Sequence, residues 1–83
     1  MPIYKIELRN SALKFLKTQT VNTQRRVMSA ISELPNSSNI KKMKGYVNRY
    51  RLRVGDIRII YDKFDDVLVI VVVEIGYRGD IYK

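Results

Sequence analysis

The sequence predicts an α+β domain in which a two-helix hairpin packs on one face of a small twisted antiparallel sheet. Residues 3–8 alternate between apolar and polar side chains, as a half-buried strand does. Residues 12–34 repeat apolar side chains at helical spacing, and residues 49–75 form strand-like runs separated by turn residues. The predicted order is β-α-α-β-β-β, with a possible short terminal strand. With 83 residues, of which 46% are hydrophobic, the chain is predicted to form a single domain over residues 1–83.

The first predicted strand and helix occupy the amino-terminal end of the chain. Ile3–Leu8 is the strand, because its side chains alternate with period two. Asn10 or Ser11 is then placed to cap a short helix. The apolar stripe of this helix consists of Ala12, Leu13, Phe15 and Leu16.

A second helix is predicted over Thr23–Leu34, after an interruption at residues 20–22 that offers another cap. Pro35 ends this helix, since the residue before a proline avoids helical backbone angles. The expected buried face consists of Val27, Met28, Ile31 and Leu34. Two short helices joined by a brief link indicate a helical hairpin on a sheet.

The segment Arg49–Tyr61 predicts a β-hairpin that turns at Gly55-Asp56, where a residue tolerant of positive φ is needed. The implied cross-strand pairs are Val54 with Ile57, Arg53 with Arg58, Leu52 with Ile59, and Tyr50 with Tyr61. One face of the hairpin is then apolar, and the other carries Arg49, Arg51, Arg53 and Arg58. Because like charges opposed across strands are destabilising, this second face indicates an anionic ligand.

The remaining segments connect and complete the sheet. Pro35–Asn39 is a loop by composition, and Lys41–Gly45 is a basic connector into the hairpin. Asp65-Asp66 marks another turn. Val67–Ile75 is so apolar that it is predicted to be a central strand covered on both faces. Asp80–Lys83 is the candidate last strand.

Composition narrows the possible functions. A formal net charge of +8 favours nucleic acid, an acidic protein or an anionic membrane surface as the partner. The absence of cysteine removes disulfides and thiolate nucleophiles, and the absence of histidine removes the usual general base and the commonest metal ligand. Any catalysis would rest on Tyr, Lys, Arg, Asp or Glu. No metal or other cofactor is predicted. The carboxylates considered as ligands are Asp62, Asp65, Asp66 and Asp80, and they do not recur at the spacing of a metal site.

The amino-terminal segment indicates a cytosolic protein. Lys5, Glu7 and Arg9 interrupt any apolar stretch there, so no secretory signal is predicted. The longest apolar run, Val67–Val73, is too short to span a bilayer. The expected location is therefore the cytosol.

Basic and aromatic side chains are the candidates for ligand binding. A guanidinium group can donate two parallel hydrogen bonds to the oxygens of one phosphate, and it keeps its charge near neutral pH. A polyanion backbone is therefore the natural ligand of the hairpin arginines. A solvated surface is the alternative explanation for any single arginine. Lys41, Lys42 and Lys44 would steer a nucleic-acid backbone, or only solubilise a loop. Tyr46 and Tyr77 flank the basic surface and are placed to stack an unpaired base.

Tyr82 has two interpretations. A penultimate tyrosine commonly tucks a terminal strand against the core, and the residues alone favour this structural role. Beside Arg78 and the hairpin arginines, however, the surrounding cations would favour the phenolate, which is a usable base where histidine is lacking.

The chain resembles toxins of the RelE/ParE superfamily from bacterial type II toxin–antitoxin modules. The resemblance runs nearly end to end, over the opening strand, the helix pair, the connector Lys42–Gly45, the hairpin Tyr50–Tyr61, the apolar strand and the closing segment Ile75–Tyr82. RelE-like members of this superfamily cut messenger RNA in the ribosomal decoding site. ParE-like members share the fold, poison DNA gyrase and generally lack the catalytic set.

The resemblance also implies roles for individual residues. The catalytic set of RelE-like enzymes falls on Arg51, Arg53, Arg58, Arg78 and Tyr82. The best-known members have lysines where this chain has Arg51 and Arg53, and arginine is a poor proton donor. Arg51 and Arg53 are therefore expected to stabilise charge and not to transfer a proton. Further contacts to the substrate are expected from Lys41, Lys42, Lys44, Arg49 and Tyr77.

The reaction implied by the resemblance is metal-free RNA cleavage. The ribose 2′-hydroxyl attacks the adjacent phosphorus and leaves a 2′,3′-cyclic phosphate, with Tyr82 as the base and with Arg58 and Arg78 stabilising the developing charge. An acidic, partly disordered antitoxin is the implied protein partner, since it would complement the basic surface. The alternatives are a gyrase inhibitor and a nucleic-acid-binding protein without RNA chemistry.

Overall fold

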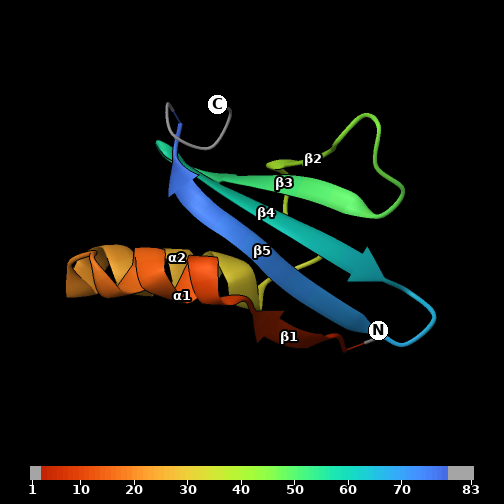
Figure 1. Ribbon diagram of the computed structural model, residues 1–83, viewed down its shortest axis with the longest axis horizontal. Helices are drawn as coiled ribbons and strands as arrows, with labels where there is room; N and C mark the ends of the chain where they lie inside the picture. The colour runs from red at the N-terminus through yellow and green to blue at the C-terminus, as the bar shows by residue number, and fades with distance from the viewer. Residues whose placement is uncertain (1–2, 79–83) are drawn as a thin grey trace.

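The computed structural model describes residues 3–78, which form a five-stranded sheet with two helices on one of its faces (Figure 1). The elements are β1 (Lys5–Leu8), α1 (Asn10–Lys17), α2 (Val21–Ser32), β2 (Ile40–Lys42), β3 (Arg49–Val54), β4 (Ile57–Phe64) and β5 (Val69–Tyr77). The strands follow the order β1-β5-β4-β3-β2 across the sheet. The predicted α+β class with a helix pair on one face is confirmed.

Two features of the sheet differ from the prediction. The sheet is mixed and not wholly antiparallel, because β1 runs parallel to β5, with Lys5 opposite Val69. This pairing joins the two ends of the chain, and the periodicity of a single strand does not indicate which neighbour it will have. In addition, the basic connector begins with the short strand β2, which pairs with β3. Three residues are too few for an alternating pattern to be recognised.

The predicted hairpin register is confirmed in full. Val54 lies opposite Ile57 and Arg53 opposite Arg58, and the two remaining predicted pairs also form. Gly55 has a φ of +59°, a backbone angle that glycine adopts without steric cost. A side chain at this position would also meet the guanidinium of Arg26, because an added Cβ would lie 3.0 Å from its Nη2 atom.

The core lies between the helices and the sheet. Thr20 caps α2 as predicted, since its hydroxyl accepts a hydrogen bond of 3.2 Å from the Thr23 amide. The predicted cap of α1 is wrong, because Arg9 occupies that position without a side-chain bond, and Ser11 instead donates to the Val73 carbonyl of β5. The main core cluster consists of Ala12, Leu16, Val27, Ile31, Leu34, Leu52, Ile57, Ile59, Tyr61, Ile70, Val72 and Ile75. Met28, predicted to be buried, is 42% exposed.

The strand β5 lies inside the sheet, between β1 and β4. It starts two residues later than predicted and continues through Gly76 to Tyr77. The candidate last strand, Asp80–Lys83, lies outside the described residues, and so does Tyr82. Within residues 3–78, no helix is long and apolar enough to cross a membrane.

Candidate nucleic-acid interface

Four arginines lie on the sheet face that points away from the helices. Leu52, which lies between Arg51 and Arg53 on β3, belongs to the core cluster on the helix side. Because successive side chains of a strand point to opposite faces, both neighbouring arginines occupy the other face. Arg58 lies opposite Arg53 on β4, and Arg49 follows the same alternation on β3. We call the surface formed by Arg49, Arg51, Arg53 and Arg58 the arginine face.

The strand register arranges the arginine face in rows that cross the sheet. Lys41 of β2 lies opposite Arg51, which lies opposite Ile60 of β4. Hollows of about 200 and 240 Å³ open beside this row, and Lys41 and Arg51 line both of them. Arg53 lines the smaller hollow together with the polar residues Ser38 and Asn39. A strand of nucleic acid lying here would meet cations from two or three adjacent strands.

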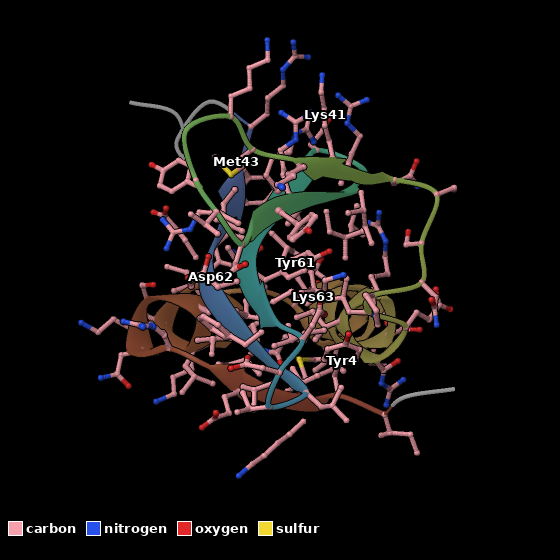
Figure 2. The ribbon with its side chains drawn as sticks, turned by 90° about the vertical axis from the view of Figure 1, so that its right-hand side faces the viewer. Tyr4, Lys41, Met43, Tyr61, Asp62 and Lys63 are labelled. Carbon is pink, nitrogen blue, oxygen red and sulfur yellow. The ribbon has the colours of Figure 1, made fainter. Side chains whose placement is uncertain are left out.

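Lys41, Lys42 and Lys44 are exposed around the larger hollow. Lys41 lies at the outer edge of the sheet, where nitrogen-tipped side chains gather (Figure 2). Met43, between these lysines, is half-buried and lines the same hollow. The structure therefore brings the predicted lysine cluster next to the arginine face.

Arg58 is buried and hydrogen-bonded at the turn of the hairpin. Its side chain is almost fully buried, and its Nη1 atom donates to the carbonyls of Gly55 at 3.1 Å and Ile57 at 3.4 Å. Burying a cation is costly unless polar groups compensate for the lost water. The turn carbonyls supply part of that compensation and fix the direction of the guanidinium. This arrangement suits a preorganised positive charge.

Arg49 lies in a different environment from the other arginines. Its Nε atom forms an ion pair of 2.7 Å with Asp62 Oδ1, and its Nη2 atom donates to Oδ2 at 3.0 Å. The guanidinium also lies 4.7 Å above the ring centroid of Tyr46. The hydrogen bond to Asp62 raises the pKa of Arg49 above its usual value. Its charge is therefore compensated within the protein, whereas the sequence suggested a substrate contact.

Tyr77 lies on the helix side of the sheet and not on the arginine face. It is opposite Ile57, a core residue. Its hydroxyl donates to Gln19 Oε1 at 2.7 Å, and its ring contacts Phe15 edge-on, with 5.5 Å between the centroids. The structure does not bring this predicted base-stacking residue to the arginine face. Alternation along β5 explains the difference, because only one residue in two can face the ligand.

Arg78 lies at the end of the hairpin that carries Arg53 and Arg58. Its backbone amide donates to the Asp56 carbonyl at 2.9 Å, which ties the residue to the β3–β4 turn. The side chain is exposed. The backbone of the first residue after β5 is thus held at the turn whose carbonyls also bind Arg58. Tyr82, four residues further on, lies outside the described part of the chain.

Glu74 lies on the same side of the sheet as the arginine face, and the sequence reasoning missed it. It lies on β5 opposite Ile60, which is buried but separate from the main core cluster. Glu74 itself is exposed. One signal was available: it is the single charged residue in the apolar run 67–75. Among residues 3–78, no group of three or more histidine, cysteine or acidic side chains is arranged to hold a metal ion.

Comparisons with known proteins agree with this fold. The chain is similar to one from the RelB–RelE antitoxin–toxin complex of Methanococcus jannaschii, with 30% identity, a TM-score of 0.75, and coverage of 92% of this chain and 94% of that one. It is also similar to one from the archaeal RelE–RelB complex of Pyrococcus horikoshii, with 25% identity, a TM-score of 0.77, and coverage of 96% and 99%. The isolated RelE toxin of E. coli shares the fold, with 20% identity, a TM-score of 0.75, and coverage of 95% and 90%.

No match emerged from a search of curated protein sequences. A family model, described as the ParE toxin of the type II toxin–antitoxin system parDE, matches residues 6–82 and therefore nearly the whole chain. The chain belongs to this toxin family, within the RelE/ParE superfamily.

Proposed function

We propose that this toxin is a metal-independent endoribonuclease that cuts messenger RNA on the ribosome, in the cytoplasm. The observation that carries the proposal is the gathering of Arg51, Arg53 and Arg58 on one face, with Arg78 at the same end of the hairpin. Several guanidinium groups around one phosphate can balance the charge that builds up during cleavage. A protein that only bound a nucleic-acid backbone would have little need for a buried, fixed cation such as Arg58.

The proposed reaction is an internal transesterification of the RNA strand. The 2′-oxygen forms a bond to phosphorus, the bond from phosphorus to the 5′-oxygen breaks, and the products carry a 2′,3′-cyclic phosphate and a 5′-hydroxyl. Arg58 and Arg78 stabilise the negative charge on the phosphorane oxygens. Arg51 and Arg53 hold the strand, and Tyr82, which the resemblance implies as the base, takes part in the proton transfer.

Two macromolecular partners follow from the same surface. The lysine cluster Lys41, Lys42 and Lys44 steers the RNA backbone toward the arginine face. The ribosome supplies much of the positioning, because few groups on this face can read a base sequence. An acidic antitoxin segment covers the basic surface and blocks the site; two of the structures similar to this chain, from M. jannaschii and P. horikoshii, are complexes of RelE with RelB.

A gyrase inhibitor is the second candidate function. The observation in its favour is that the matching family model is that of ParE toxins. In that case the arginine face would bind a protein or DNA surface without RNA chemistry. Expression in growing cells distinguishes the nuclease from the gyrase inhibitor. A nuclease arrests translation and leaves cut messages, whereas a gyrase poison causes the cells to grow as filaments and their DNA to break.

The direct test uses purified protein and ribosomes programmed with a defined message. We expect the wild type to release fragments ending in 2′,3′-cyclic phosphate, and Arg78→Ala and Tyr82→Phe to fold normally but cleave on the order of a hundredfold more slowly. Circular dichroism spectra confirm the folding of each variant. Undiminished cleavage by both variants removes the assignment of these residues, and absence of cleavage by the wild type contradicts the nuclease function.

A further inference from the structure

Glu74 is a carboxylate next to the cations of the arginine face. Its register partner is Ile60, so it lies in the same row as Arg51, two strands away. Two strand spacings amount to roughly 10 Å between the Cα atoms. Arg58, whose register partner is Gly76, is the diagonal neighbour of Glu74, at roughly 7–8 Å. Gly76 contributes no side chain between them.

The charged groups around Glu74 come from four elements. Arg58 lies diagonally opposite on β4, and Arg51 lies beyond Ile60 on β3. Arg9 follows β1, where its amide donates to the Val72 carbonyl, and Arg78 follows the end of β5. These four are cations, but the same side of the sheet also carries two carboxylates near Glu74, Asp62 of β4 and Glu7 of β1, which both lie opposite Val71. Among residues 3–78, Glu74 forms no ion pair.

The proposed cleavage needs a base that is unprotonated at neutral pH. A phenol ordinarily keeps its proton until about pH 10, whereas a glutamate carboxyl ordinarily loses its proton near pH 4. A carboxylate beside several guanidinium groups thus accepts the 2′-hydroxyl proton without prior ionisation of a phenol. Histidine, which often fills this role, does not occur in the chain.

We propose that Glu74 is the general base of the RNA cleavage, an inference that rests on the proposed nuclease function. Its carboxylate takes the proton of the attacking 2′-hydroxyl as the bond from the 2′-oxygen to phosphorus forms. As the bond from phosphorus to the 5′-oxygen breaks, that oxygen takes the phenolic proton of Tyr82, which thus acts as the acid and not as the base that the resemblance implied. The two protons exchange with solvent before the next turnover. The inference thus gives a direction to each proton transfer.

The sign of the effect of Glu74→Gln separates catalysis from simple electrostatics. If Glu74 only repels the RNA phosphates, its neutralisation strengthens binding and leaves kcat unchanged or higher. If Glu74 is the base, the same substitution lowers kcat on the order of a hundredfold or more, while KM stays equal or falls. Glutamine has nearly the same size and shape, so the packing of this exposed position is preserved.

Single-turnover cleavage of ribosome-bound message, measured from about pH 5 to 9, tests the proposal. We expect Glu74→Gln to lose activity throughout this pH range, and Glu74→Asp to recover part of the rate. Glu33→Gln is the matched control, because Glu33 is an exposed glutamate at the end of α2 and its removal changes the net charge equally. We expect Glu33→Gln to cleave like the wild type.

Two results overturn the inference. Wild-type or faster cleavage by Glu74→Gln shows that the carboxylate is not the base, and the nuclease function then stands without it. Equal losses in Glu74→Gln and Glu33→Gln show an effect of net charge alone. If the wild-type protein itself leaves ribosome-bound message uncut, the proposed function fails, and the role of Glu74 fails with it.

Discussion

The two faces of the hairpin β3–β4 are built from the same two strands but differ in burial and charge. On the helix side, Leu52, Ile59 and Tyr61 are almost completely buried in the core. On the other side, Arg53 and Arg58 lie opposite each other, a pairing that costs stability. The comparison teaches that one side of these strands is selected for folding. The other side tolerates a folding cost, as expected of a surface that binds an anion.

Replacing Leu52 by alanine is expected to have the largest effect on stability. Leu52 is 1% exposed and contacts the centre of the core, so its truncation leaves a cavity. The expected loss is about 2–5 kcal/mol of unfolding free energy. Urea unfolding followed by circular dichroism measures this loss. A loss below about 0.5 kcal/mol would mean that the helix side of the hairpin is not the structural side.

The second prediction concerns Tyr61 at alkaline pH. Burial raises the pKa of the Tyr61 phenol, and the stacked Tyr50 ring, 5.5 Å away, adds to the shift. Because the folded state favours the neutral phenol, the associated stability is complete below pH 10 and is lost as the pH rises above that value. Tyr61→Phe should therefore show a flatter decline in melting temperature between about pH 9.5 and 11. Parallel declines in both proteins would contradict this assignment.

The third and smallest effect distinguishes Arg49 from the other arginines. Since Arg49 is paired with Asp62, Arg49→Ala should cost at most about 1 kcal/mol of stability and change RNA affinity little. Asp62→Asn, which leaves the guanidinium without its carboxylate, should strengthen RNA binding and steepen its dependence on salt. Fluorescence anisotropy with a 2′-O-methyl RNA measures the affinity and its salt dependence, and urea unfolding measures the stability of Arg49→Ala. A loss of affinity in Arg49→Ala as large as that in Arg51→Ala would return Arg49 to the RNA-binding set.

The local pattern of the chain was sufficient to predict the hairpin. Alternation placed Leu52 and Arg53 on opposite faces, and Gly55 marked the turn, so register and faces followed from adjacent residues. The parallel pairing of β1 with β5 was not predictable in the same way, because it joins segments more than 60 residues apart. Such a contact depends on how the helices return the chain to the sheet, and no local periodicity records it.

The candidate site was predicted only in part, for a related reason. Arg51, Arg53 and Arg58 were grouped correctly because they belong to one hairpin. Glu74 and Tyr77 required the register of β5 against β4, where an irregularity between Ile60 and Tyr61 shifts the pairing. A shift of one residue exchanges the two faces of a strand. Sequence alone therefore could not decide which side chains of β5 accompany the arginines.

The central claim is that the arginine face acts on RNA while the helix side only maintains the fold. One experiment on two neighbouring residues of β3 tests this claim. It measures the rate of message cleavage on ribosomes, divided by the folded fraction, for the variants Arg53→Ala and Leu52→Ala. We predict that Arg53→Ala is folded within about 0.5 kcal/mol of the wild type and cleaves at least tenfold more slowly. Leu52→Ala should keep the wild-type rate per folded molecule. An unchanged rate for Arg53→Ala, with a reduced rate per folded molecule for Leu52→Ala, would contradict the account.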